Sequence, residues 1–460
     1  MDWASQEIRQ ASFRGIIGVA RQDITPPVGI YARCWGAATH DVAEGIHRPL
    51  TLTAITFQRD DSDTPLVLIA ADLMSWRSRD AESAVIAAFL KETRLPRERL
   101  MFCLSHTHAA PSVRREDSDK PGGHLIKPYQ EHLLRAAIVA TREAQASKKP
   151  ATLSWRYGRC DLASNRDLAD PAGGERVICG FNPSAPADDT LLVGRVSDDA
   201  TGRSLANIVN YACHPTTLAW DNRLISPDYV GAIREVIEAA TNAPCLFLQG
   251  ASGELAPAEQ YSGETALADR HGRQLGYAVL STLQAIGPPR TMLAYHGVVE
   301  SGAPLAVWKR NEAPADTTLA AVMREVDLPL KSMPPLVKIE EQWRTCDDPV
   351  LKERLGRQLA VRRIVGEGAT ARVPFWVWRL GDALLLGHPN EAYSLLQTEL
   401  RRRLRPRPLG VMNLVNGSAA YLPPHDMYEK NTYAVWQTPF AAGSLEALID
   451  AAASSLEALK

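Results

Sequence analysis

The sequence predicts an α/β fold, a layered sandwich in which central mixed β-sheets are flanked by helices. Short apolar runs typical of buried strands alternate with longer stretches that have a helical period. The expected strands cover 66–71, 101–104, 208–213, 245–248, 383–387 and 411–415, and the expected helices cover 81–93, 129–146, 229–241, 266–285, 391–404 and 444–459. Several strands run directly into polar residues. Because ligands of α/β sheets bind beyond strand ends, we expect a functional site there.

One domain is expected to span residues 1–460, although length alone would be compatible with about three. The segment from about 311 to 368 is charged, helix-prone and interrupted by prolines, which predicts a helical excursion on the same domain. The segments 116–123 and 169–187 are rich in Pro, Gly and Asp and are expected to be loops.

Charge and apolar patterning exclude several functional classes. The net charge of -2 gives no field that favours nucleic acid or an anionic membrane, and the basic run Arg401–Arg403 is interpreted as a solvated helix end. No apolar stretch approaches the roughly 20 residues that span a bilayer, so no stable membrane insertion is expected. Residues 1–14 lack the apolar core of a secretion signal. The seven cysteines form no Cys-x-x-Cys pair, and we expect a cytoplasmic protein.

Two histidines directly follow the strand expected at 101–104. In an extended chain His106 and His108 would point to the same side, because side chains alternate with a period of two. Two imidazoles that face one cavity suit a metal ligand paired with a proton-transfer group. A His-x-His pair is common, however, and its interpretation depends on the rest of the chain.

Five further residues are candidates for the same site. His214 ends an apolar run, and Pro215 favours an extended backbone there; a hydrogen-bonded core histidine is the alternative. Glu391 follows a strand and is expected in the first turn of a helix, where the helix dipole alone would explain a carboxylate. His388 competes with Glu391 as a ligand candidate. Tyr421 and Tyr433 lie twelve residues apart; a tyrosine can serve as a rare zinc ligand or as an oxyanion donor, but by themselves these two are explained as half-buried aromatics.

An ordered set of motifs resembles the catalytic domain of the neutral ceramidases, zinc-dependent amidases that cleave the N-acyl bond of ceramide. The matching segments span roughly residues 18–433, and they are Gly18–Pro27, Gly45–Leu50, Ser105–His108, Asn165–Arg166, His214–Thr216, Ser226–Gly231 and Gly253–Pro257. The spacing of the two tyrosines also fits that family. The resemblance implies the layered fold of that domain without the family's C-terminal immunoglobulin-like domain.

The same resemblance implies a site. It implies that His106, His214, Glu391 and Tyr421 hold zinc, and it places His108, Arg166 and Tyr433 around the scissile carbonyl. Zinc would lower the pKa of a bound water toward about 7, which favours direct attack by zinc hydroxide. His108 would move protons to the leaving group, and Arg166 and Tyr433 would stabilise the oxyanion. We expect Asp72 and Asp228 to orient the ligating histidines.

Departures from the family pattern concern the substrate more than the metal. Gly250 aligns where the family carries an active-site serine, Ser252 is offset from that position, and Asn390 precedes the ligand in place of glycine. We therefore predict cleavage of an amide in a small, possibly acylated molecule rather than in ceramide. An ester, a lactone or another bond cleaved on the same scaffold is the alternative, and a binding protein without turnover is the third.

Overall fold

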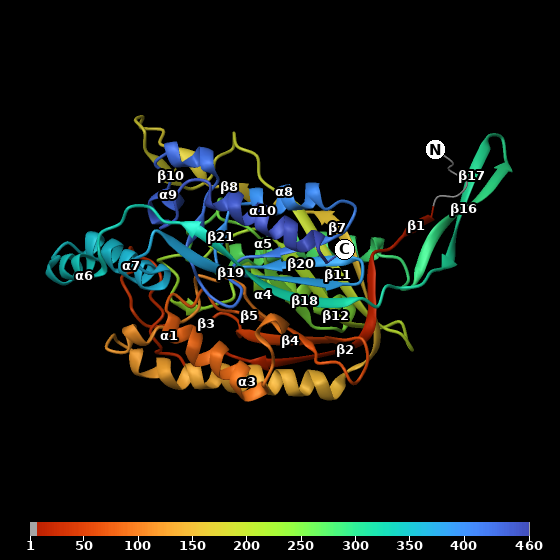
Figure 1. The fold of residues 1–460 in the computed structure, drawn as a ribbon, viewed down its shortest axis with the longest axis horizontal. Helices are drawn as coiled ribbons and strands as arrows, with labels where there is room; N and C mark the ends of the chain where they lie inside the picture. Colours follow the sequence, from red (N-terminus) through yellow and green to blue (C-terminus); the bar gives the residue numbers. More distant parts are fainter. Residues whose placement is uncertain (1–6, 460) are drawn as a thin grey trace.

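The larger of two central sheets has eight strands in the order β14–β12–β11–β7–β2–β4–β5–β6. The computed structural model describes residues 7–459, and Figure 1 shows this part of the chain. The strands are β2 (Ser12–Asp23), β4 (Thr51–Gln58), β5 (Leu66–Ala71), β6 (Leu100–Leu104), β7 (Lys149–Arg159), β11 (Thr190–Asp198), β12 (Ser204–Tyr211) and β14 (Cys245–Gln249). The outer pairs β12–β14 and β5–β6 are parallel, and the inner pairs are antiparallel, so the sheet is mixed.

The second sheet has four strands in the order β18–β19–β20–β22. They are β18 (Leu319–Pro329), β19 (Thr370–Leu380), β20 (Ala383–Gly387) and β22 (Leu409–Met412). This sheet packs against the larger one through Trp376, Trp378 and Leu385, which are fully or almost fully buried beside Leu66 and Leu68.

Helices cover the outer face of each sheet: α3 (Ile126–Ser147), α4 (Tyr229–Thr241) and α5 (Thr265–Ala285) contact the larger sheet, and α8 (Leu395–Arg403) and α10 (Ser444–Glu457) contact the smaller one. The other helices are α1 (Arg79–Glu82), α2 (Ala88–Thr93), α6 (Leu336–Thr345), α7 (Pro349–Val365) and α9 (Tyr433–Gln437), of which α6 and α7 pack on each other at one end of the molecule in Figure 1. In β5, Leu66 and Leu68 face the second sheet, whereas Val67 and Ile69 pack in the cluster that contains α3. That alternation predicts a strand buried on both faces, and the order of layers is helices, sheet, sheet, helices. The predicted fold class is confirmed.

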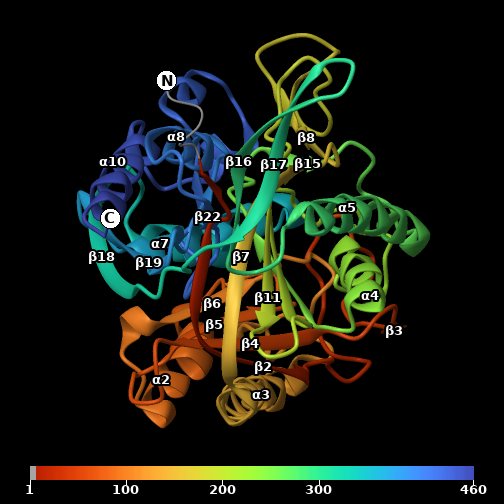
Figure 2. The ribbon, with the colours of Figure 1, turned by 90° about the vertical axis from the view of Figure 1, so that its right-hand side faces the viewer.

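The eight-stranded sheet curls until its two edges approach each other. Strand β14, at one edge, contacts β5 and β6 at the other edge, and both β12 and β14 contact β22 of the second sheet. Figure 2 shows β11, β7, β4 and β5 around this curved core. As a result, the carboxyl ends of β6 and β12, which lie six strands apart in the sheet order, meet in one region.

A β-ribbon projects from this body, as Figure 1 shows. It consists of β16 (Thr291–Glu300) and β17 (Pro304–Glu312), and β1 (Glu7–Arg9) pairs with β16 at its base. Several apolar side chains of the ribbon are exposed, among them Val298, Val299 and Leu305. The sequence analysis did not predict this ribbon.

Two predicted segments differ in the structure. The segment 311–368 contains the long strand β18 before α6 and α7, so its helical part is shorter than predicted. The helix predicted from residue 391 begins only at Leu395, and Glu391–Ala392 instead forms the short strand β21. The first six residues of the segment 1–14, considered for a secretion signal, lie outside the described residues, and the rest contributes to β1 and β2. Among the helices of residues 7–459, none combines the length and apolarity that crossing a bilayer would require.

Candidate metal centre

His106 lies two residues past the end of β6 and is almost fully buried. Its backbone has a φ of 69°, in the left-handed region that residues other than glycine seldom adopt. The extended geometry assumed for Ser105–His108 is therefore wrong at His106. The His106 N–H donates to the carbonyl of Leu73 at 2.9 Å, which anchors this conformation to the loop after β5. Backbone strain of this kind clusters at functional sites.

His214 follows β12 and is fully buried. Its N–H donates to the carbonyl of Leu255 at 2.8 Å, and its Nδ1 lies 2.6 Å from the carbonyl oxygen of Ser252. Burial, together with Arg166 and His106, lowers the pKa of His214 to about 3 against the opposing effect of Glu391. The ring is therefore neutral near pH 7, as a metal ligand must be.

Glu391 and Tyr421 are direct neighbours across a short parallel pair. Strand β21 (Glu391–Ala392) pairs with β23 (Tyr421–Leu422), with Glu391 opposite Tyr421. The Glu391 side chain is 16% exposed, and the rings of His106 and His214 lie beside its carboxylate. Glu391 lies in a strand rather than in the helical turn predicted for it.

Both predicted histidine ligands converge on this carboxylate. The Nε2 atoms of His106 and His214 each lie 3.2 Å from Oε2 of Glu391. The Nδ1 atom of each ring faces a backbone carbonyl, that of Met74 for His106 and that of Ser252 for His214. A carbonyl that accepts from Nδ1–H leaves the lone pair on Nε2, so both rings present the correct tautomer for a metal ion. The residues present fit a divalent metal that prefers nitrogen and oxygen ligands.

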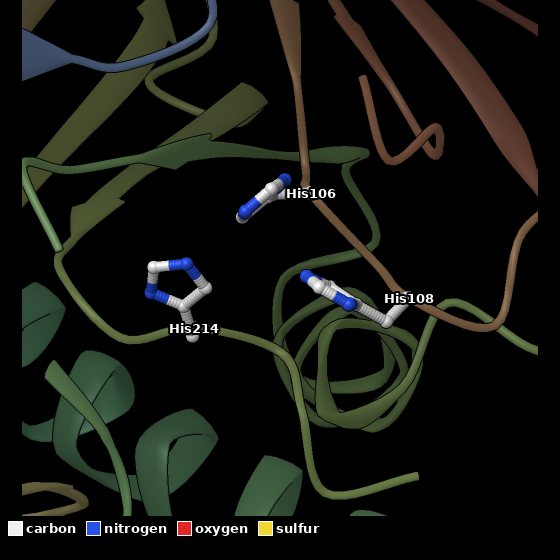
Figure 3. A group of neighbouring side chains, drawn as sticks. All are labelled: His106, His108 and His214. Atoms are coloured by element: carbon white, nitrogen blue, oxygen red, sulfur yellow. The ribbon is translucent and has the colours of Figure 1, made fainter. Parts of the chain in front are cut away.

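His108 belongs to the same group. Ligand nitrogens of His106, His108 and His214 lie within 4.8 Å of one another, and Figure 3 shows the three rings facing a shared space. Burial and the two neighbouring histidines hold the pKa of His108 well below its usual range. Its Nδ1 lies 3.5 Å from Sγ of Cys34, whereas its buried Nε2 has no partner among the described residues. His108 therefore has one nitrogen left for a further group in the site.

Arg166 and Tyr433 reach the site through Tyr421. Nη2 of Arg166 donates to the carbonyl of Gly253 at 2.7 Å and to the hydroxyl of Tyr421 at 3.1 Å. The rings of Tyr421 and Tyr433 meet edge to face at 5.7 Å between centroids. All seven side chains predicted for the site are thus linked by contacts within one region, and Arg166 and Tyr433 lie against a predicted ligand.

Three other residues considered from the sequence lie apart from this group. Position 250 has no space for a side chain, because a Cβ there would lie 2.9 Å from Cβ of Ala212. The hydroxyl of Ser252 accepts from Nε2 of Gln249 at 2.6 Å inside the protein. His388 is buried, and its Nδ1 accepts from the N–H of Asn390. None of them contacts the three gathered histidines through its side chain in the described structure.

The roles expected for Asp72 and Asp228 are corrected. Asp72 forms a two-fold ion pair with Arg234, and Asp228 accepts from the N–H groups of Leu218 and Tyr229. Neither aspartate orients a histidine, since backbone carbonyls occupy both Nδ1 positions. Every residue has a backbone carbonyl, so the sequence does not show which carbonyl will accept a hydrogen bond from a histidine.

Sequence reasoning missed four residues that lie around His108 and Tyr433. The ring of Trp35 lies 5.1 Å from that of His108, and Cys34 contacts its Nδ1. Arg77 approaches Cys34 from the loop after β5, and Arg357 of α7 donates to the hydroxyl of Tyr433 at 2.8 Å. No local pattern marks them, since Arg357 lies in an ordinary charged helix far along the chain.

Glu254 adds a measurable pH dependence behind the site. Its carboxylate accepts from the N–H of Ser394 at 3.0 and 2.9 Å, and burial raises its pKa to about 7. The folded state thus holds a proton that the unfolded chain releases near pH 4.5. Stability must therefore fall as the pH rises from about 5 to about 7, by roughly 3 kcal/mol in total from this group.

The measurement is the free energy of unfolding at pH 5 and pH 8 for the wild type and for Glu254→Gln, whose amide resembles the protonated acid. We expect the wild type to lose more stability than the variant between these pH values. Parallel pH profiles of the two proteins would contradict the assignment.

Comparisons with known proteins bear on the fold. No family model matches the sequence, and no curated protein matches it. The structure is similar to the crystal structure of a neutral ceramidase from Pseudomonas aeruginosa, with a TM-score of 0.69, 17% identity, and coverage of 98% of this chain and 75% of that one. It is also similar to a ceramidase complexed with C2, with a TM-score of 0.68, 16% identity, and coverage of 98% and 76%. The resemblance found in the sequence is confirmed at the level of architecture: this chain has the neutral ceramidase fold.

Proposed function

We propose that this protein is a zinc-dependent hydrolase that cleaves an amide bond in a small N-acylated molecule. The observation that carries the proposal is the meeting of two imidazole Nε2 atoms, from His106 and His214, at one oxygen of Glu391. Both rings are held in the tautomer that leaves this nitrogen free, and a buried carboxylate completes a donor set suited to zinc. The fold shared with two ceramidases agrees with this assignment.

In the proposed site His106, His214, Glu391 and Tyr421 hold the metal. Zinc supplies a Lewis acid that lowers the pKa of water toward about 7 and polarises a carbonyl oxygen. Arg166 donates to Tyr421 and keeps the tyrosine hydroxyl in place beside Glu391. The place of Glu391 in β21 rather than in the first turn of a helix supports a ligand role over the helix-dipole explanation.

His108 and Tyr433 act on the substrate in this proposal. His108 is neutral near pH 7, and its unpartnered Nε2 accepts a proton as the attacking water is activated and returns it to the leaving amine. Tyr433 presents a hydroxyl that accepts from Arg357 and retains its own proton for the oxygen of the tetrahedral intermediate. No side chain fits at position 250, which favours attack by water over an acyl-enzyme.

The test is a panel of substrates that share one acyl group and differ in the bond. It contains an N-acyl amine, the corresponding ester, a lactone and a short-chain ceramide, each assayed with the purified protein before and after chelation and after zinc is restored. We expect the small amide to be cleaved fastest and zinc to restore the activity. Cleavage restricted to esters or lactones would overturn the amidase assignment, and binding without turnover of any member would favour a binding protein.

A further inference from the structure

An arginine beside His108 has no anionic partner in the protein. Arg77 lies in the loop between β5 and α1, is half-buried, and approaches Sγ of Cys34 with Nη2 at 4.0 Å. Within residues 7–459 no carboxylate forms an ion pair with it, whereas Arg48, Arg234 and Arg357 each pair with one. A thiol is a weak acceptor, so the five N–H donors of this guanidinium are poorly satisfied.

Arg77 is held in this place by a strained backbone conformation. Its φ of 50° is left-handed, and the flanking Trp76 and Ser78 are buried. Ser78 caps α1 through Ala81, and the N–H of Trp76 donates to the hydroxyl of Ser418. Both neighbours are thus held by other elements. A strained residue that the surroundings hold in place is typical of a ligand-binding position.

The other charged groups around His108 already have hydrogen-bond or ion-pair partners. Arg357 forms an ion pair with Glu353 at 2.5 Å and donates to Tyr433. Glu391 faces His106 and His214. Arg166, like Arg77, has no carboxylate partner, but a carbonyl and a tyrosine hydroxyl accept from its Nη2. This side of the site therefore carries an excess of positive charge centred on Arg77.

Cys34 connects Arg77 to the proton-transfer group. Its Sγ lies 3.5 Å from Nδ1 of His108 and 4.0 Å from Nη2 of Arg77, so the guanidinium lies one side chain away from the imidazole. This contact is on the Nδ1 side of His108, and Nε2, which transfers the proton in the proposed function, is the other nitrogen of the same ring. A group bound by Arg77 therefore lies beside the imidazole that protonates the leaving group, which in amide cleavage is the amine.

We propose that Arg77 binds a carboxylate on the amine half of the substrate, so that the scissile amide joins an acyl group to an amino acid. This inference rests on the proposed amidase function and narrows its substrate class. A planar guanidinium with its donors in a fork matches a carboxylate in two-fold geometry. The single positive charge of Arg77 would be balanced by the single negative charge of one carboxylate. A neutral sphingoid amide offers Arg77 nothing to bind.

The experiment compares an N-acetyl amino acid with its neutral carboxamide, which has nearly the same shape. We expect the wild type to prefer the acid in kcat/KM, and Arg77→Gln to lower kcat/KM for the acid roughly 100-fold, mainly through KM. The carboxamide should be cleaved by both proteins at rates within about threefold of each other. Arg77→Lys should retain part of the preference, because it keeps the charge without the fork.

Arg94→Gln is the matched control. Arg94 is also an arginine with a left-handed backbone, φ 54°, but it is exposed at the end of α2. The same loss of charge at the same backbone geometry should leave both substrates unaffected there. Calorimetric binding of the N-acetyl amino acid to the zinc-loaded wild type and to Arg77→Gln gives a second measurement that does not depend on turnover.

The outcomes separate this inference from the proposed function. Equal losses for acid and carboxamide in Arg77→Gln, equal binding of the acid by both proteins, or a wild type that prefers the carboxamide would overturn the role of Arg77 while amide cleavage still stands. Faster cleavage of a dicarboxylic acid monoamide than of the N-acetyl amino acid would place the anion on the acyl half and overturn the assignment. Without cleavage of any amide the proposed function fails, and the binding measurement still decides whether Arg77 holds a carboxylate.

Discussion

Alanine at both His106 and His214 is expected to remove bound zinc and to lower amide cleavage at least roughly 1000-fold, because a catalytic metal and its bound water are lost together. Metal content per chain, measured by elemental analysis after purification in the presence of zinc, should fall from near-stoichiometric to background. The double variant leaves Glu391 buried without its two imidazole partners. Circular dichroism must therefore show that the protein remains folded.

A double variant with alanine at His124 and His296 is the control. Both histidines are exposed, and neither belongs to the group that His106, His108 and His214 form. The control should keep its zinc and its activity. If the His106 and His214 double variant kept its metal, the ligand assignment would be wrong. His108→Ala then separates the two roles of the cluster, since it should retain zinc and lose turnover.

The second large effect concerns stability. Asp72→Asn should lower the free energy of unfolding by about 3–5 kcal/mol, because it leaves the guanidinium of Arg234 buried without a negative partner. The pair is two-fold, with N–O distances of 2.9 and 2.6 Å, and the side chains are only 2% and 9% exposed. Urea denaturation of the metal-free proteins measures this loss without a contribution from zinc binding.

Two variants sharpen that measurement. Glu92→Gln breaks an ion pair with Arg142 in which both side chains are more than half exposed, and it should cost less than about 1 kcal/mol. Adding Arg234→Met to Asp72→Asn removes the stranded charge and should recover much of the stability. A small effect of Asp72→Asn alone would mean that water reaches Arg234, and it would contradict the burial described above.

The sequence predicted the layers well because buried strands and helices have apolar residues at regular spacings. Leu66–Ala71 and Tyr229–Thr241 form the strand and the helix expected of them, and both are packed in the core. Glu391 was placed in a helix because Leu395, Leu396 and Leu400 continue a helical period after it. In the structure Glu391 and Ala392 form a two-residue strand that pairs with Tyr421 and Leu422 before the helix begins. No local sequence pattern distinguishes such a strand from a first helical turn.

The structure brings the residues predicted for the site into one region, but the groups that support them were not predicted. His106 and His214 were found because they follow apolar runs, but their orienting partners are backbone carbonyls rather than the nearby carboxylates. Arg77 and Arg357 escaped prediction because their importance depends on Cys34 and Tyr433, which lie far from them in sequence. Contacts of that kind arise only once the sheets are stacked.

The curled sheet also has a consequence for folding. His106 and His214, which meet at Glu391, precede it by 285 and 177 residues in the chain. They follow strands β6 and β12, which approach each other only when the sheet curls. Contacts of such long range form slowly, because the chain loses loop-closure entropy before these contacts stabilise it. If the proposed metal site binds zinc, we expect that affinity to arise at the end of folding, so zinc uptake during refolding would time the closure of the sheet.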